Sequence, residues 1–310
     1  MIVRPPRLPL DAVQIDHVEV DAVLLAPDGE AIGRPWISLA IDLATRMIVG
    51  LHVSAAPPTR LSAGLCLLHA VCDKTRWQTR RGLDAPWPCA GLPRRVATDA
   101  RSFFGGRRFA LACRALGVVH ADSAPRPGGY GGHVEALIGQ NIGAAVLVRG
   151  GAPLAAGRRR PEPPRDLIAT ETWLGAQIAV YHARRHPDLR RSPLAAWTAQ
   201  DISASSRTPD DCLRFRLSFF PQEDCTLEPD GLKLGNATYW SRGLEDDLAA
   251  GRPRLAVRYD PRDMSRIFVE RPSGRFVKAR AQQAERAETP VSAEAPDCSR
   301  KCLSACPFEG

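Results

Sequence analysis

Apolar residues near the start of the chain recur in a pattern that predicts β-strands. Residues 13–25 alternate in a strand-like way, and Pro27-Asp-Gly29 then predicts a turn. Two more short apolar runs follow at residues 36–41 and 47–53, separated by a polar segment. We therefore expect three antiparallel strands at the start of the fold.

Helical and strand-like patterns alternate after these strands. Residues 61–71 have helical spacing, with Thr59 or Ser62 as the cap, and residues 76–93 are interpreted as a surface loop. The later elements are a strand at 95–98, a helix at 103–116, a strand at 118–120, a glycine-rich loop at 125–132 and a helix at 133–148. Three strands followed by helix, strand, helix, strand and helix is the order of the RNase H-like fold, an α/β architecture, although other α/β folds share parts of it.

The second half of the chain predicts a connector and a small β-barrel. Residues 150–165 are interpreted as a linker, and helices are expected at 167–183 and from Pro193, with Ser192 as its cap. Short strands at 217–220, 232–234, 255–259 and 267–269 predict the barrel. We therefore expect an RNase H-like core at 8–150, a linker and helical connector at 151–205, a barrel at 210–279 and a disordered tail at 280–310.

Composition changes this picture little. The formal net charge of +8 suits a polyanionic partner, but many proteins share such an excess. Only four basic residues are lysine, and either phosphate recognition by arginine or a GC-rich genome explains that bias. The nine cysteines form no CxxC pair, and the start of the chain lacks an apolar signal core. We expect a soluble, cytoplasmic, nucleoid-associated bacterial protein with no membrane partner.

Three acidic residues occupy positions suited to a two-metal site. Asp16 lies in the first strand, Asp99 ends the fourth, and Glu135 lies in the first turn of the helix after the fifth. Hard divalent cations prefer such oxygen ligands, and two ions about 4 Å apart can hold a phosphodiester. On a regular strand Glu19 and Asp21 point to the face opposite Asp16, whereas Asp42 is not excluded as a ligand.

An ordered set of motifs runs along the chain. They are Ile15-Asp16-His17, Gly33-Arg-Pro-Trp36, Ala40-Ile-Asp-Leu43, Arg46-Met-Ile-Val-Gly50, Thr98-Asp99, Gly132-His-Val-Glu-Ala-Leu-Ile-Gly139, Tyr181-His182 with His186, Ser192-Pro-Leu-Ala-Ala-Trp197, Val257-Arg-Tyr-Asp-Pro-Arg-Asp-Met-Ser265 and Ile267-Phe-Val269. Asp99 and Glu135 have 35 residues between them. This set resembles the catalytic core and C-terminal barrel of the Mu-type Asp-Asp-Glu transposases, within the retroviral integrase superfamily, which favours that separation.

The resemblance implies a polynucleotidyl transferase that cuts transposon ends and joins their 3′-hydroxyls to target DNA. By the same resemblance, Asp16, Asp99 and Glu135 are catalytic and hold two Mg²⁺ or Mn²⁺ ions. It further implies a homo-multimer on paired ends, with an ATPase that selects the target as a possible partner. The barrel arginines implied to contact DNA are Arg254, Arg258, Arg262 and Arg266.

Two alternatives remain open because the chain departs from the family pattern. The loop after Asp99 reads Ala-Arg-Ser-Phe-Phe104 instead of the usual Asn-Gly turn, and the chain starts almost at the core. End recognition is then lost or lies in another polypeptide, and the chain is an inactive DNA-binding remnant of a transposase. The second alternative is an RNase H-like nuclease, a class that typically carries a fourth acid.

Other polar residues have ordinary structural interpretations. His17 is either a structural histidine or a residue that orients a metal-bound water. His182 and His186 have zinc-like spacing, but packing or DNA contact is favoured because no paired cysteines lie nearby. The cysteines at 298, 302 and 306 are assigned to a disordered tail, and Arg158-Arg-Arg160 to a solvated linker.

Overall fold

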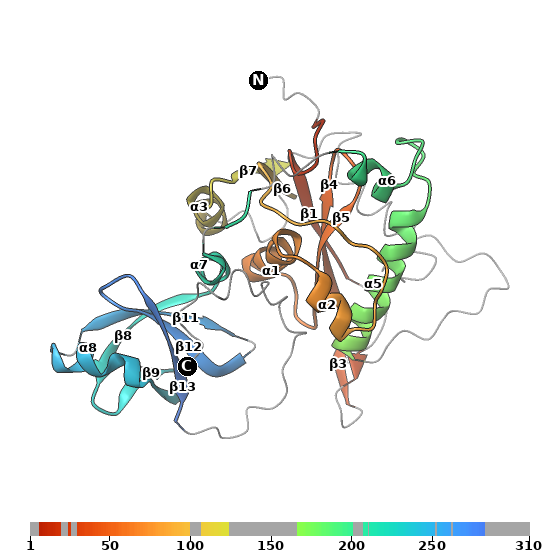
Figure 1. Ribbon diagram of the computed structural model, residues 1–310. Helices are drawn as coiled ribbons and strands as arrows, with labels where there is room; N and C mark the ends of the chain where they lie inside the picture. Colours follow the sequence, from red (N-terminus) through yellow and green to blue (C-terminus); the bar gives the residue numbers. More distant parts are fainter. Residues whose placement is uncertain are drawn as a thin grey trace.

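A computed structural model gives the architecture of the protein (Figure 1). It describes residues 6–19, 24–25, 30–99, 107–123, 166–200, 207–209, 211–251, 253–261 and 263–282. The expected glycine-rich loop, the helix at 133–148, the linker at 150–165 and nearly all of the expected tail lie outside these residues.

A five-stranded sheet forms the first unit. Three strands are antiparallel, β1 (Val13–Glu19), β4 (Trp36–Asp42) and β5 (Ile48–Ser54), while β6 (Arg95–Asp99) and β7 (Val119–Ser123) continue the sheet in the direction of β1. The order across the sheet is β5-β4-β1-β6-β7, so β1 is central. The prediction of three opening antiparallel strands is confirmed.

The expectation of one strand-like segment over residues 13–25 is wrong. The first strand of the sheet ends at Glu19, and β2 (Leu24–Leu25) pairs instead with β3 (Ala31–Gly33) as a separate two-stranded ribbon. The apolar pattern of the sequence does not reveal this change of sheet, because Leu24 in β2 is also fully buried. Periodicity alone does not show that a strand leaves its sheet.

Helices α1 (Arg60–Val71) and α5 (Leu167–Ala183) pack on opposite sides of the sheet, which lies between them in Figure 1. Helix α1 begins at Thr59, whose side chain accepts a hydrogen bond from the Leu61 N–H, while Ser62 accepts one from the Thr59 N–H. Both expected capping residues therefore take part in one capping box. A Cβ at Gly50 would clash with the Cys66 carbonyl, so α1 lies directly on β5. Helix α5 lies on the other side.

The expected surface loop at 76–93 is wrong in part, because much of this segment is packed. Helix α2 (Thr75–Arg80) begins it, and Trp77, Trp87 and Cys89 are buried. Arg81 forms a buried ion pair with Glu171 of α5. The arginine, glycine and proline content suggested exposure, but aromatic burial and this ion pair fix the segment against the core.

The predicted C-terminal β-barrel is confirmed as a closed barrel of six strands. Its centre holds Leu232, Tyr239, Val257, Ile267 and Val269, all fully buried. A short 3₁₀ turn (Arg242–Leu244) and helix α8 (Glu245–Ala249) interrupt the strands. The strands are β8 (Gln222–Glu228), β9 (Gly231–Leu234), β10 (Ala237–Trp240), β11 (Arg254–Asp260), β12 (Asp263–Glu270) and β13 (Phe276–Ala281).

The strand expected at 217–220 is wrong, since helix α7 (Cys212–Leu217) occupies this region. The Asp211 carboxylate caps the helix by accepting from the Arg214 N–H at 2.8 Å. Phe215, Phe219 and Phe220 are buried in the core of the first unit, so a run of aromatic residues that resembles a strand forms a helix and a following turn.

This segment joins the core to the barrel. The Phe219 ring fills the space over Gly64 of α1, where even a Cβ would clash with it. The same ring lies 5.6 Å from Phe109 of α3 (Arg107–Ala115). On the barrel side, Phe220 lies 6.3 Å from Phe268, and Arg214 lies over the Phe276 ring. The barrel therefore sits on the core through buried aromatic contacts.

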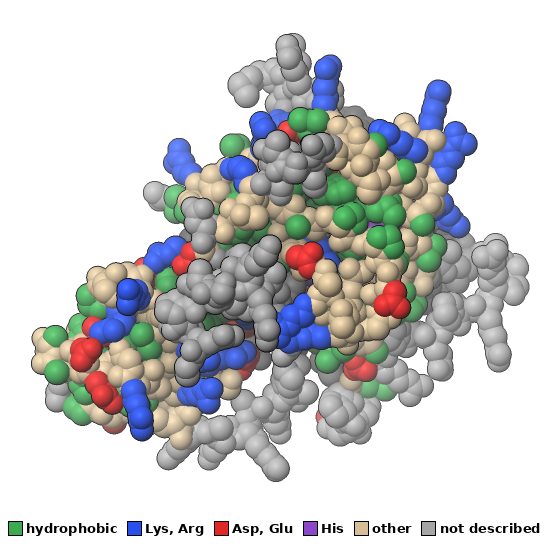
Figure 2. Space-filling view, viewed as in Figure 1, with side chains coloured by type: hydrophobic (Ala, Val, Ile, Leu, Met, Phe, Trp, Pro, Cys, Tyr) green, Lys and Arg blue, Asp and Glu red, His purple; other side chains and the backbone are tan. Residues whose placement is uncertain are grey.

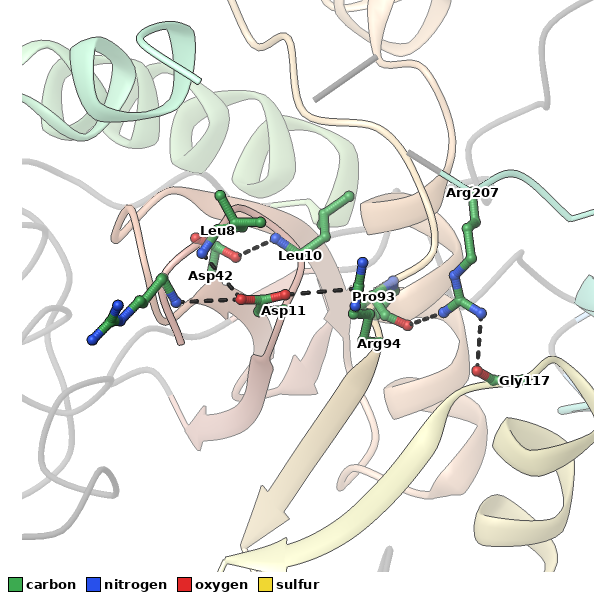
Figure 3. Close-up of polar contacts among 9 residues, drawn as sticks. Leu8, Leu10, Asp11, Asp42, Pro93, Arg94, Gly117 and Arg207 are labelled. Atoms are coloured by element: carbon green, nitrogen blue, oxygen red, sulfur yellow. Dashed lines mark hydrogen bonds and ion pairs between the residues drawn. The ribbon is translucent and has the colours of Figure 1, made fainter. Parts of the chain in front are cut away.

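Hydrogen bonds tie the first residues to the end of the sheet where β1 starts (Figure 3). The Leu10 carbonyl accepts from the Arg94 N–H at 2.7 Å, just before β6. Arg207, from the segment that leads to the barrel, donates to the carbonyls of Pro93 at 2.8 Å and Gly117 at 3.0 Å. The segment leading to the barrel is therefore also fixed at this end.

Candidate active site

Asp16 is the middle residue of β1, the central strand of the sheet. Its backbone pairs with Leu39 of β4 on one side, and its Oδ1 accepts a hydrogen bond from the His17 N–H at 2.8 Å. The side chain is partly exposed, unlike the fully buried Ile15 before it. Asp16 is the first of the four partly exposed residues that end β1, so its carboxylate can bind a ligand from solution.

Asp99 is the last residue of the neighbouring parallel strand. Ile15 of β1 pairs with Thr98 of β6, and Asp16 and Asp99 each follow by one residue. Paired parallel strands lie about 4.8 Å apart, so the backbones of the two aspartates are neighbours. Glu135, the third expected ligand, lies outside the described residues. No group of three possible metal ligands occurs within the residues that the structure describes.

Asp42 occupies the other end of the sheet, and this placement removes it as a candidate ligand. It pairs with Val13, whereas Asp16 pairs with Leu39, three residues away along β4. Its carboxylate is fully buried and accepts from the Leu10 N–H at 2.8 Å, the Thr45 N–H at 2.8 Å and the Thr45 hydroxyl at 2.7 Å. Burial raises the pKa of Asp42, and these hydrogen bonds oppose that shift. Asp42 shapes the β4–β5 turn.

We expect Asp42→Ala to lower the free energy of unfolding by about 2–4 kcal/mol, because several buried N–H and O–H donors lose their acceptor. Urea unfolding measures this change, with exposed Asp84→Ala as the control. Below its lowered melting temperature the variant should keep whatever DNA chemistry the wild type has. A fully folded variant without that chemistry would return Asp42 to the catalytic site.

Glu19 and His17 occupy the last part of β1. Glu19 is an odd number of positions from Asp16, which on a regular strand sets its side chain on the opposite face. The Nδ1 atom of His17 lies 2.6 Å from the Ser38 hydroxyl on β4. Burial lowers the pKa of His17 to about 3, so its imidazole is neutral near pH 7. These contacts favour the structural interpretation of His17. Asp21 lies outside the described residues.

His182 and His186 do not form a metal-binding pair. The His182 Nε2 accepts from the Ile48 N–H at 3.0 Å, and its ring lies 5.4 Å from Trp87. His186 instead packs beside Tyr181, with its Nδ1 accepting from the Asp188 N–H at 3.2 Å. Packing, the favoured interpretation of these two residues, accounts for both.

The buried His182 predicts a loss of stability in mild acid. Burial lowers its pKa to about 3, whereas the unfolded side chain titrates near 6.5. The unfolded chain therefore binds the extra proton first as the pH falls below 6.5. The native state should lose about 2 kcal/mol through this residue between pH 7 and pH 5.

Thermal unfolding at several pH values measures this dependence. His182→Gln keeps an acceptor for the Ile48 N–H and cannot titrate, so its stability should change less with pH. An equally steep pH dependence in this variant would contradict the prediction.

The four arginines predicted to contact DNA differ in their surroundings. Arg254 is exposed on β11, and Arg266 on β12 is exposed with an ion pair to Asp263 at 2.8 Å. Arg258 donates to the Leu217 carbonyl of α7 at 2.9 Å and lies 3.8 Å from Glu270, so its donors serve the core–barrel contact. Arg262 lies outside the described residues.

Two polar features were not found from the sequence. Lys74 is fully buried, and its ammonium donates to the carbonyls of Ala70, Cys72 and Cys89, while burial lowers its pKa to about 8. The second feature is a group of exposed arginines after α5, next to Arg46. Their closeness depends on tertiary contacts that no spacing rule reveals. None of the described helices is long and apolar enough to cross a membrane.

Comparison with protein families gives two matches, in the same order as the two structural units. Residues 14–144 match the model of the TnsB C-terminal domain, and residues 216–278 match that of the C-terminal domain of Mu transposase. The chain belongs to the Mu-type transposases. The first match includes the positions of Asp16, Asp99 and Glu135, and the second covers most of the barrel.

Individual relatives of this Mu-type chain are distant. The transposase for transposon Tn552 from Staphylococcus aureus is 22% identical over 272 residues, which are 86% of this chain and 53% of that protein. The Tn7 transposition protein TnsB from Escherichia coli is 30% identical over 107 residues, 34% of this chain and 15% of that protein. The chain thus spans about half the length of the first relative and far less of the second.

Solved structures similar to this Mu-type chain include integrases. One is a chain of the simian T-cell lymphotropic virus intasome in complex with PP2A regulatory subunit B56 gamma, with a TM-score of 0.41, 11% identity and coverage of 95% of this chain and 82% of that one. Another is the catalytic core domain of BIV integrase, with a TM-score of 0.36, 14% identity and coverage of 63% and 99%.

Proposed function

We propose that this Mu-type chain catalyses metal-dependent DNA strand cleavage and strand transfer on an RNase H-like core. The observation that carries the proposal is the parallel register of β1 and β6, in which Asp16 and Asp99 follow the Ile15–Thr98 pair. The sheet order β5-β4-β1-β6-β7, with three antiparallel strands and then two parallel ones, supports the RNase H-like assignment. Glu135 is proposed as the third acid because its position falls within the same family match.

The donor set fits hard divalent cations. Two carboxylate-bearing residues at neighbouring positions repel each other unless a cation lies between them, and Mg²⁺ and Mn²⁺ prefer such oxygen ligands. Asp16, Asp99 and Glu135 would hold two ions, which when bound activate the attacking hydroxyl and stabilise the leaving oxygen of the phosphodiester.

We propose that the barrel binds DNA away from the metal site. Arg254 and Arg266 are exposed on neighbouring strands, and guanidinium groups bind phosphate oxygens well. We further propose that the chain acts as a homo-multimer on paired transposon ends and joins them to target DNA, with an ATPase as a possible target-selecting partner.

Strand joining tests this proposal directly. Purified protein is incubated with Mn²⁺, pre-cut transposon-end DNA and a plasmid target, beside Asp99→Ala. Joined products that disappear in the variant support strand transfer. DNA binding without chemistry in either protein would support the inactive remnant instead, and cleavage without joining would support the nuclease.

A further inference from the structure

The turn between α5 and α6 (Pro193–Thr198) is rich in arginine. Arg184, Arg185, Arg190 and Arg191 are all exposed, and within the described part of the chain none of them is in an ion pair. Asp188 is the acid of this turn. Figure 2 shows basic side chains along the upper right margin, where Figure 1 places the end of α5 and α6. The turn therefore presents a concentrated positive charge.

Backbone hydrogen bonds hold this turn in a defined conformation. The His186 N–H donates to the Arg191 carbonyl at 3.0 Å, and the Arg190 N–H donates back to the His186 carbonyl at 3.0 Å. Arg190 has a φ of 55°, in the left-handed region that non-glycine residues rarely adopt. The hydrogen bonds therefore fix the backbone from which the arginines of the turn extend.

Arg46, in the β4–β5 turn, extends the same surface. Its carbonyl accepts from the Tyr181 hydroxyl at 2.8 Å, and the Tyr181 ring lies 6.4 Å from His186 in the arginine-rich turn. Arg46 also has a left-handed backbone, with a φ of 62°. Its Nε and Nη1 atoms are buried and have no acceptor among the described residues. Arg46 as a whole is partly exposed, so its guanidinium adds positive charge to this surface.

We propose that Arg46 and the four arginines of the turn bind the phosphate backbone of duplex DNA. This inference rests on the proposed function, but it adds a surface separate from both the metal site and the barrel. Arg46 lies at the end of the sheet where β1 starts, whereas Asp16 lies in the middle of β1 and Asp99 at the carboxyl end of β6. A duplex carries about one charge per 1.7 Å of its axis, and it matches a group of arginines with little acidic charge among them.

Salt-dependent binding tests the surface without requiring any DNA chemistry. Binding of the full chain to a duplex of about 30 base pairs is measured by fluorescence anisotropy in EDTA, at several salt concentrations. The Arg184→Gln/Arg185→Gln/Arg191→Gln variant is compared with Arg76→Gln/Arg80→Gln/Arg114→Gln, which removes three exposed arginines elsewhere. We expect the first variant to bind about 10- to 100-fold more weakly, with a salt dependence reduced by about 2–3 phosphate contacts.

The same loss in both variants, or in neither, would overturn the proposal. Because chemistry is absent from the assay, failure of strand transfer would not affect this outcome.

A measurement on the wild-type protein covers the case of a variant that does not fold. Phenylglyoxal modification of individual arginines is followed by mass spectrometry with and without the duplex. DNA should protect the four arginines of the turn more than Arg76, Arg80 and Arg114. Lack of protection, or equal protection by polyglutamate at the same charge concentration, would overturn the assignment to DNA.

Discussion

Asp16→Asn should reduce metal-dependent strand joining by about 10³-fold or more while leaving the protein folded. Losing a metal ligand removes several kcal/mol of stabilisation from the charge that develops at the phosphate. The partly exposed side chain of Asp16 accepts a hydrogen bond from its neighbouring His17 N–H, so a neutral isostere should cost little stability. Joining in Mg²⁺ and thermal unfolding, measured together, separate these two effects.

A change of metal preference gives a sharper test of Asp16 as a ligand. Asp16→Cys should be inactive with Mg²⁺ and partly active with Mn²⁺, because a thiolate binds the softer ion better. Glu19→Gln, three residues further along the same strand, should keep both activities. An Asp16→Cys variant that responds equally to both metals would argue against direct coordination by residue 16.

Phe219→Ala should lower the free energy of unfolding by about 3–5 kcal/mol, the usual cost of removing a buried phenyl ring. Phe219 is 3% exposed, and its ring fills the space over Gly64 and lies 5.5 Å from Phe215. Gly64 has no side chain that could fill the space left by the ring. Urea unfolding monitored by tryptophan fluorescence measures the loss.

The matched control is Leu111→Ala on α3, since that side chain is 50% exposed and the change should stay within about 0.5 kcal/mol. If the two substitutions cost the same, Phe219 does not anchor the barrel segment. If Phe219→Ala also separates the unfolding of the two units into two transitions, the ring connects their stability as well as their positions.

The sequence predicted the sheet and the barrel well because both depend on short-range patterns. The periodicity identified the strands on which Val13, Ile15, residues 37–41 and residues 48–53 are buried. The position of Asp16 beside Asp99 followed from the resemblance, and the Ile15–Thr98 register agrees with it.

Tertiary contacts decided the residues that the sequence did not settle. The aromatic residues near position 219 form a helix and a turn because they fill space between α1, α3 and the barrel. Asp42 remained a candidate ligand until its hydrogen bonds with four donors showed that it stabilises the β4–β5 turn from the end of β4. Arg46 and the arginines of the α5–α6 turn are more than a hundred positions apart, and the Tyr181 hydroxyl joins them.

The segment from Arg207 to Phe220 belongs to both units, and this limits how the gene can be divided. Arg207 donates hydrogen bonds to residues next to β6 and β7, and Phe219 fills the space over Gly64 of the core. Both residues come before β8, the first strand of the barrel. A fragment ending before Arg207 would expose the aromatic contact surface of α1 and α3. Recombination that exchanges barrels between relatives would therefore keep the contacts of this segment with the core only if its crossover point lay after Phe220, and the new barrel would still have to supply partners for Phe220 and Arg214.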